Sequence, residues 1–149
     1  MKTIKNSLKL VFPSNSENES LARMAVSSFL SVGGVPVGDI AELKTAVSEG
    51  VTNAIVHGYR GSHGNVTLEM KLFASGRVKI VIRDKGVGIE DIELAMEPLY
   101  TTAPEEERAG LGFAIMKSFC DKLRVRSKVG GGTVVTLEKY ISDGVNDDC

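Results

Sequence analysis

The chain has 149 residues, 42% of them hydrophobic, and its 18 Lys and Arg residues nearly balance 19 Asp and Glu residues. One domain of this length can bury roughly 70% of the surface that the unfolded chain exposes, so we expect neither a disulfide framework nor a structural metal. No stretch approaches the roughly 20 apolar residues of a transmembrane helix, no signal-peptide core is evident, and the net charge is −1. Together these features predict a cytoplasmic protein that binds neither a membrane nor nucleic acid.

The chain begins with a predicted strand and a predicted helix. Apolar and other side chains alternate over residues 8–12, and Pro13, which cannot donate to a neighbouring strand, ends the strand. Ser16 and Glu19 match a capping box, so we expect a helix to follow until Gly33-Gly34.

A second helix and a hairpin come next. Asp39 and Glu42 match another capping box, and apolar residues at helical spacing continue until a helix end near Gly58. Residues 66–72 and 78–82 then alternate apolar and polar side chains on either side of a turn, which indicates a β-hairpin.

The last part of the chain predicts a short acidic helical stretch up to Met96, a third helix over residues 111–123, and two strands beginning near Val125 and Thr133. The element order is strand, helix, helix, strand, strand, helix, strand, strand. This order predicts an α/β two-layer sandwich, with helices on one face of a mixed, mostly antiparallel sheet. Residues 1–141 are expected to form one domain, and residues 142–149 a disordered acidic tail.

A polar stripe runs along the second predicted helix. Glu49, Asn53 and His57 recur at four-residue intervals, away from the apolar face, and their neighbours on the helix are small or apolar. Gly50 costs on the order of 1 kcal/mol relative to alanine in a helix, which indicates close approach by another group. A solvated helix face and a functional site both remain open interpretations.

Two glycine-containing segments are also candidate sites. Asp84 follows directly from the hairpin, ahead of Gly86 and Gly88; the segment is either a turn or a place where a carboxylate accepts from an amino group and the backbone lies against a flat ligand. Residues 110–113, Gly-Leu-Gly-Phe, open the third predicted helix, where free backbone N–H groups can bind an anion. Neither the Walker nor the Rossmann phosphate-binding pattern occurs.

Four segments, taken in order, resemble the conserved boxes of the GHKL ATP-binding family, which includes gyrase, Hsp90, MutL and histidine kinases. They are residues 48–59, residues 84–88, residues 110–113 and Gly132-Thr133. Within that family the whole chain is most similar to the serine kinases that act as anti-sigma factors. The resemblance implies the Bergerat α/β sandwich, with ATP held between the helix layer and a lid over residues 98–109.

The resemblance also implies roles for individual residues. Asp84, helped by Thr133, would recognise the amino group of adenine, while Gly86 and Gly88 would let adenine and ribose lie against the backbone. Asn53 would be the Mg²⁺ ligand. The implied phosphate contacts are Gly110, Leu111, Gly112 and Phe113 through the backbone, and Arg108 and His57 through their side chains. For Arg108 a solvated helix start, and for His57 an ordinary helix end, remain open.

Glu49 would be the general base of phosphoryl transfer. It would accept the proton of a serine hydroxyl as that oxygen attacks the γ-phosphoryl group. Position 50 is Gly where the related kinases usually have Ala, which could loosen the helix that carries this base.

The function implied is that of an anti-sigma factor and ATP-dependent protein serine kinase that acts as a homodimer. It would bind and inhibit a sporulation sigma factor, with Arg23 as a candidate contact, and use Mg-ATP to phosphorylate a serine on an anti-anti-sigma factor. A stress-response kinase of the same type and a nucleotide-dependent binding switch without transfer are the alternatives. A histidine-kinase module is disfavoured because residues 1–48 contain no histidine to accept the phosphoryl group.

Overall fold

A computed structural model describes residues 3–96 and 104–141 of the chain, with side chains at all of these except 104–110. The elements are, in chain order, β1 (Ile4–Pro13), α1 (Asn18–Val32), α2 (Val37–Thr52), the π-helical segment η1 (Asn53–Gly58), β2 (Asn65–Phe73), β3 (Arg77–Asp84), α3 (Ile92–Ala95), α4 (Pro104–Phe119), β4 (Lys122–Lys128) and β5 (Gly132–Tyr140). The predicted tail at 142–149 and the first half of the predicted lid, at 98–103, lie outside the described residues.

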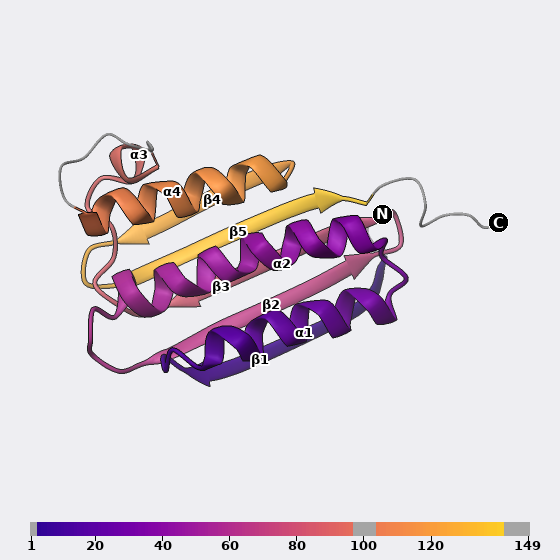
Figure 1. Cartoon of the computed structure of the whole chain (residues 1–149), viewed down its shortest axis with the longest axis horizontal. Helices are drawn as coiled ribbons and strands as arrows, with labels where there is room; N and C mark the ends of the chain where they lie inside the picture. Colours follow the sequence, from indigo (N-terminus) through magenta and orange to yellow (C-terminus); the bar gives the residue numbers. More distant parts are fainter. Residues whose placement is uncertain (1–2, 97–103, 142–149) are drawn as a thin grey trace.

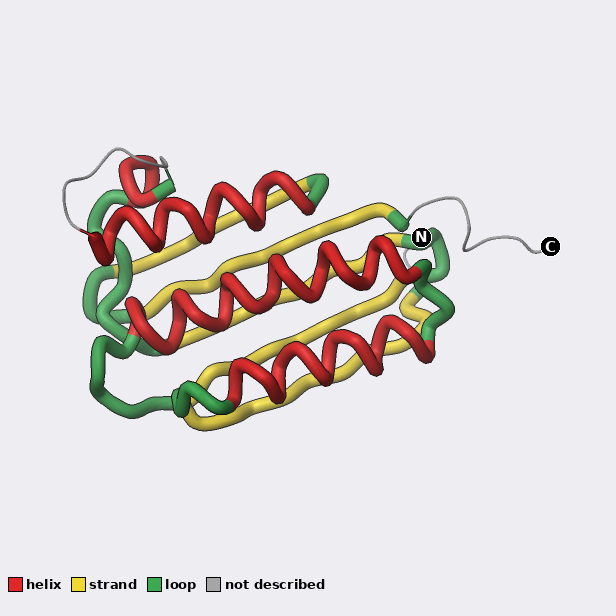
Figure 2. The backbone as a smooth tube through the Cα atoms, in the orientation of Figure 1, coloured by secondary structure: helices red, strands yellow, loops and turns green. Residues whose placement is uncertain are grey.

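The five strands form one sheet in the order β1-β2-β3-β5-β4, and every neighbouring pair in it is antiparallel. Helices α1, α2 and α4 lie side by side on one face of this sheet (Figure 1). Figure 2 shows the resulting two layers, with the helices on one side of the strands. The predicted α/β sandwich is therefore confirmed, as is the hairpin, which consists of β2 and β3.

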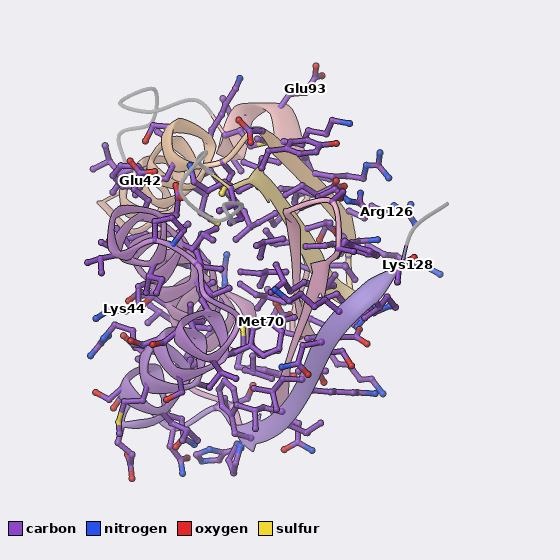
Figure 3. All side chains as sticks on the ribbon, turned by 90° about the vertical axis from the view of Figure 1, so that its right-hand side faces the viewer. Glu42, Lys44, Met70, Glu93, Arg126 and Lys128 are labelled. Atoms are coloured by element: carbon purple, nitrogen blue, oxygen red, sulfur yellow. The ribbon has the colours of Figure 1, made fainter. Side chains whose placement is uncertain are left out.

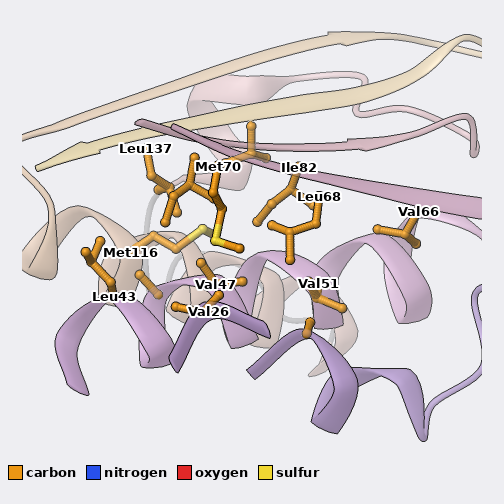
Figure 4. Close-up of a cluster of buried hydrophobic side chains, with 14 of the residues drawn as sticks. Val26, Leu43, Val47, Val51, Val66, Leu68, Met70, Ile82, Met116 and Leu137 are labelled. Atoms are coloured by element: carbon orange, nitrogen blue, oxygen red, sulfur yellow. The ribbon is translucent and has the colours of Figure 1, made fainter. Parts of the chain in front are cut away.

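The apolar core fills the space between the two layers. Alternate residues of β2, β3 and β5 meet the apolar side of α2, and Figure 4 shows Val47 and Val51 of α2 facing Leu68, Ile82 and Leu137 of the sheet. A Cβ built on Gly50 would collide with Cδ1 of Ile82. The close approach predicted at Gly50 is thus made by the sheet itself, which sets the depth of α2 over β3.

Both predicted capping boxes are wrong. Helix α1 begins at Asn18 after Glu17, with no side-chain cap, and the Glu19 carboxylate instead accepts a hydrogen bond from Thr52 Oγ1 at 3.0 Å. Helix α2 begins directly after Pro36, which leaves Asp39 inside the first turn, where it is buried. Asp39 cannot be the cap because the helix already begins two residues before it, and Ser16 cannot because α1 begins two residues after it.

The predicted limits of the third helix are also wrong. Helix α4 begins at Pro104, seven residues earlier than predicted, because proline and acidic residues are favoured in a first turn. It ends at Phe119, and Leu123 lies in β4, opposite Leu137 of β5. Sheet pairing therefore overrides the helical spacing of Phe119 and Leu123.

No helix among the described residues is long and apolar enough to span a membrane.

Candidate functional site

A cavity of about 690 Å³ lies at one end of the sandwich, bordered by η1, the end of β3, α3, α4 and the start of β5. Six residues predicted for the site line it: Asn53, His57, Asp84, Gly88, Phe113 and Thr133. Residues from all four motif segments therefore meet here, as the resemblance predicts.

Asp84 is the last residue of β3 and is buried, with 8% of its surface exposed. Burial raises the pKa of its carboxyl above the ordinary range, and backbone hydrogen bonds from Gly86 and Thr133 offset this in part. The Gly86 nitrogen donates to Asp84 Oδ1 at 2.9 Å. A buried acceptor at the floor of a cavity is suited to recognise an amino group of a ligand.

The glycines after Asp84 allow other backbone segments of the chain to approach closely. A Cβ on Gly86 would collide with the carbonyl oxygen of Gly58, and the Gly58 carbonyl also accepts from the Val87 nitrogen at 2.8 Å. Gly88 has a φ of +79°, and a Cβ there would collide with the carbonyl of Lys128. These contacts hold the loop between η1 and the β4–β5 turn, which fixes the position of Asp84.

Two hydroxyl groups that sequence reasoning did not select anchor the same loop. Tyr59 Oη accepts from the Lys85 nitrogen at 2.8 Å, and Ser127 Oγ accepts from the Ile89 nitrogen at 2.7 Å. Ser127 Oγ also lies 2.8 Å from Oγ1 of Thr133. Tyr59 ends the segment that carries the resemblance, which was a usable signal; nothing in the pattern around Ser127 marks it.

Glu49 and Asn53 lie one helical turn apart under α4. A Cβ built on Gly112 would stand 3.2 Å from both Glu49 Oε1 and Asn53 Nδ2, so both side chains reach the same spot below this glycine. Asn53 begins η1, and such π-helical turns are frequent at functional sites. At Glu49 and Asn53 the polar stripe therefore lies against α4, and His57 lines the cavity, so the stripe is not simply a solvated helix face.

The Asn53 side chain fits a metal bound together with phosphates. Its Nδ2 is buried and has no hydrogen-bond partner among the described residues, so this amide lacks an acceptor that a phosphate oxygen could supply. The carbonyl oxygen of the Asn53 side chain is a metal ligand of the kind that Mg²⁺ prefers. No group of three or more His, Cys, Asp or Glu residues in the described part of the chain could hold a metal.

The predicted phosphate-binding segment lies differently from expectation. Residues 110–113 belong to α4 but lie beyond its first four residues, whose N–H groups are the ones without helical partners. Gly112 and Phe113 are buried, and Leu111 is 41% exposed. Arg108 lies in the first turns of α4, and its side chain is outside the described part.

A family model described as the histidine kinase-like ATPase domain matches residues 12–139. An anti-sigma F factor of Thermoanaerobacter sp. (strain X514) is 50% identical over 137 residues, which cover 91% of this chain and 94% of the relative. An anti-sigma F factor of Priestia megaterium is 45% identical over 141 residues, which cover 94% and 96% of the two chains.

The fold is also found in solved structures. The RsbU and RsbW domains of Rv1364c from Mycobacterium tuberculosis match with a TM-score of 0.69 at 21% identity, over 97% of this chain and 35% of that chain. The histidine kinase domain of a blue-light activated kinase from Erythrobacter litoralis matches with a TM-score of 0.56 at 18% identity, over 83% and 60%. The matched family is one of ATPase domains, which implies ATP as a ligand.

Proposed function

Because the chain belongs to the histidine kinase-like ATPase domain family and is similar to anti-sigma F factors over most of its length, we propose that it is an anti-sigma factor and protein serine kinase. As a homodimer it binds and inhibits sigma F, a sporulation sigma factor, and it uses Mg-ATP to phosphorylate a serine of an anti-anti-sigma factor. The observation that carries the kinase is the pair of Glu49 and Asn53, which meet under Gly112 beside the cavity.

The base of ATP lies in the cavity against Asp84. The Asp84 carboxylate accepts a hydrogen bond from the amino group of adenine, and the nearby Thr133 hydroxyl also contacts the base. This hydroxyl is oriented by Ser127, whose Oγ is 2.8 Å away. Guanine presents a carbonyl where adenine has its amino group, so a carboxylate at this place favours adenine.

Phosphate binding by residues 110–113 requires a rearrangement of α4. Backbone N–H groups become available at these residues only when the helix starts near Gly110, so the turns that contain Arg108 leave the helical conformation. Glycine is a poor helix former, and Gly110 and Gly112 therefore lower the cost of this change. Arg108 would then reach the terminal phosphate from the released segment, and His57, which lines the cavity, would lie near it.

The transfer step uses Glu49 as the base and Asn53 as the metal ligand. Mg²⁺, when bound, neutralises charge on the phosphate oxygens. The Glu49 carboxylate takes the proton of the substrate serine while the serine oxygen bonds to the γ-phosphorus and the bond to the bridging oxygen of ADP breaks. Glu49 is half-buried and is not among the residues that line the cavity; its carboxylate lies beside Asn53, which does line it.

Arg23 on α1 remains a candidate contact for the protein partners. It is half-buried, and its guanidinium donates to Ser20 Oγ at 3.0 Å and to Ser48 Oγ at 3.3 Å, beside Glu49. The hydrogen bond to Ser48 connects this side chain to the helix that bears the proposed base.

Incubation with Mg-ATP and a candidate anti-anti-sigma protein, followed by mapping of the phosphorylated residue, tests the proposal. Phosphoserine on the partner is the expected result. ATP binding without transfer would favour the nucleotide-dependent switch, and phosphohistidine on the chain itself would contradict both. Sigma F binding is tested separately, by co-elution of the sigma factor with the ATP-loaded protein in size-exclusion chromatography.

A further inference from the structure

The edge strand β4 carries a continuous row of cations on the face of the sheet that the helices do not cover. Its outward side chains are Lys122, Arg124, Arg126 and Lys128, all exposed, and they alternate with partly buried inward residues. Neighbouring cations in this row stand about 6.7 Å apart along the strand. In Figure 3 Arg126 and Lys128 lie on the sheet side, whereas Glu42 and Lys44 lie on the helix side.

The residues beside this row supply little negative charge. Across β5, Arg124 pairs with Thr136, Arg126 with Val134 and Lys128 with Gly132. Only Lys122 faces an acid, Glu138, and that carboxylate lies 2.7 Å from the guanidinium of Arg77. None of the four β4 cations has an ion pair with any side chain that the structure describes.

The balanced composition conceals this row because the two layers differ in charge. The helical layer and α3 carry acids such as Glu19, Glu42 and Glu93. Glu69, the other acid facing out from the middle of the sheet, lies 3.1 Å from Arg83. Lys and Arg are therefore clustered at β4 although the chain as a whole is nearly neutral.

Four cations at successive outward positions repel one another, and no carboxylate lies opposite Arg124, Arg126 or Lys128 to offset this repulsion. Charged side chains at a sheet edge, lysine above all, also prevent edge-to-edge aggregation, but this gives no reason for cations at all four outward positions. The neighbouring Thr136, Val134 and Gly132 offer no aromatic or large apolar group of the kind that forms the centre of a protein interface. Evenly spaced, exposed cations on the open face of the sheet instead match the evenly spaced charges of a polyanion.

We propose that the β4 face, defined as the outward side chains of Lys122, Arg124, Arg126 and Lys128, binds the phosphate backbone of nucleic acid without reading its sequence. Four phosphate contacts predict that log K falls with log salt at a slope of about −3.6, which is roughly a hundredfold loss of affinity between 50 and 200 mM salt. This binding is independent of the kinase proposal, because the β4 face points away from the helices that carry Glu49 and Asn53.

The test measures fluorescence anisotropy of a labelled 20-base-pair DNA duplex with the whole chain over that salt range. The variant Arg124→Gln/Arg126→Gln is expected to weaken binding about tenfold at 100 mM salt and to reduce the slope by about 2. The control Lys44→Gln/Lys117→Gln removes the same charge from the helix layer and is expected to leave both quantities unchanged. ATP affinity and thermal unfolding verify that each variant is folded.

Three results would overturn the proposal. They are absence of duplex binding at 50 mM salt, an equal loss of binding in the two double variants, and tighter β4-dependent binding of poly-glutamate than of the duplex. The last result would identify an acidic protein segment as the occupant.

Discussion

The hydroxyl oxygen of Tyr59 lies 2.8 Å from the backbone nitrogen of Lys85, the residue that follows the buried Asp84. The same hydroxyl donates to the carbonyl oxygen of Asn65 at 2.6 Å. One side chain at the end of η1 thus connects the end of β3 to the start of β2, and it fixes the point at which Asp84 enters the cavity.

Replacing Tyr59 with Phe should therefore destabilise the protein and disturb the site together. The change removes both hydrogen bonds of a side chain that is only 5% exposed, which should lower the free energy of unfolding by about 1–3 kcal/mol. ATP affinity should fall as well, because the Asp84 loop loses an anchor. Urea unfolding and calorimetric ATP titration measure the two effects. Tyr140→Phe, at a tyrosine that is 54% exposed, is the control, and equal effects of the two changes would contradict this role.

Asp84→Asn should weaken ATP binding without lowering the stability of the fold. Loss of the carboxylate should weaken ATP binding by about tenfold or more, since hydrogen bonds to charged groups contribute roughly 1.5–3 kcal/mol. Burial of the charged form is the largest influence on this carboxyl, so its neutral replacement should leave the unfolding free energy at pH 7 equal or higher. Isothermal titration and urea unfolding check the pair of outcomes. Unchanged ATP affinity would mean that the nucleotide site is misplaced.

The Asp84 carboxyl should also make the free energy of unfolding depend on pH. Its pKa is raised in the folded protein, so between the ordinary value and the raised value the folded state binds more protons than the unfolded state. The contribution of Asp84 to stability therefore decreases as pH rises through this window. The stability advantage of Asp84→Asn should grow from acid toward neutral pH and then become constant. Urea unfolding of both proteins across that range measures it, and a constant difference at all pH values would contradict the cause given for the shift.

The effect of Gly50→Ala on the free energy of unfolding should depend on the side chain at residue 82. Alanine improves helix propensity by about 1 kcal/mol, but its Cβ collides with Cδ1 of Ile82, the end of a flexible side chain. The single change should therefore give little or no gain in the free energy of unfolding. In the background Ile82→Val, which lacks that methyl group, the same change should stabilise the protein. Additive effects of the two substitutions in urea unfolding would show that the contact has no influence.

Gly86→Ala should cost more than Gly38→Ala. A Cβ at residue 86 meets the backbone of Gly58, which cannot move aside without shifting η1, whereas a Cβ at residue 38 meets nothing within 4 Å. We expect a loss of more than about 2 kcal/mol and of ATP binding for Gly86→Ala. Gly38→Ala, in the first turn of α2, should be neutral or slightly stabilising. Similar thermal unfolding of the two variants would contradict the tight packing of the loop.

Sequence patterns predicted the elements well because strand alternation and helical spacing are strong along most of the chain. The hairpin of β2 and β3 and the position of Asp84 at a strand end followed directly from them. The start of α4 was missed because residues 104–110 have no apolar period, and the assignment of Leu123 to a helix failed because pairing with Leu137 is a contact distant in sequence.

The sequence indicated individual residues of the site but not the contacts that hold them in position. Local motifs indicated Glu49, Asn53 and Asp84. The role of Ser127 depends on the distance between β4 and the loop after β3, and the fit of Gly86 against Gly58 depends on two segments 28 residues apart meeting in space. Neither relationship leaves a periodic signal in the sequence. The basic β4 face was hidden for a similar reason, because net charge averages over both layers.

The central claim is that Glu49 is the base of a serine kinase, and the variant Glu49→Gln tests it most directly. The measurement compares the rate of phosphoserine formation on an anti-anti-sigma partner with the affinity for Mg-ATP, in the parent and in the variant. We expect transfer to fall by about 100-fold or more, while ATP affinity stays within about twofold, because general base catalysis typically contributes 10²–10⁴-fold. Transfer at the full rate by Glu49→Gln would contradict the account.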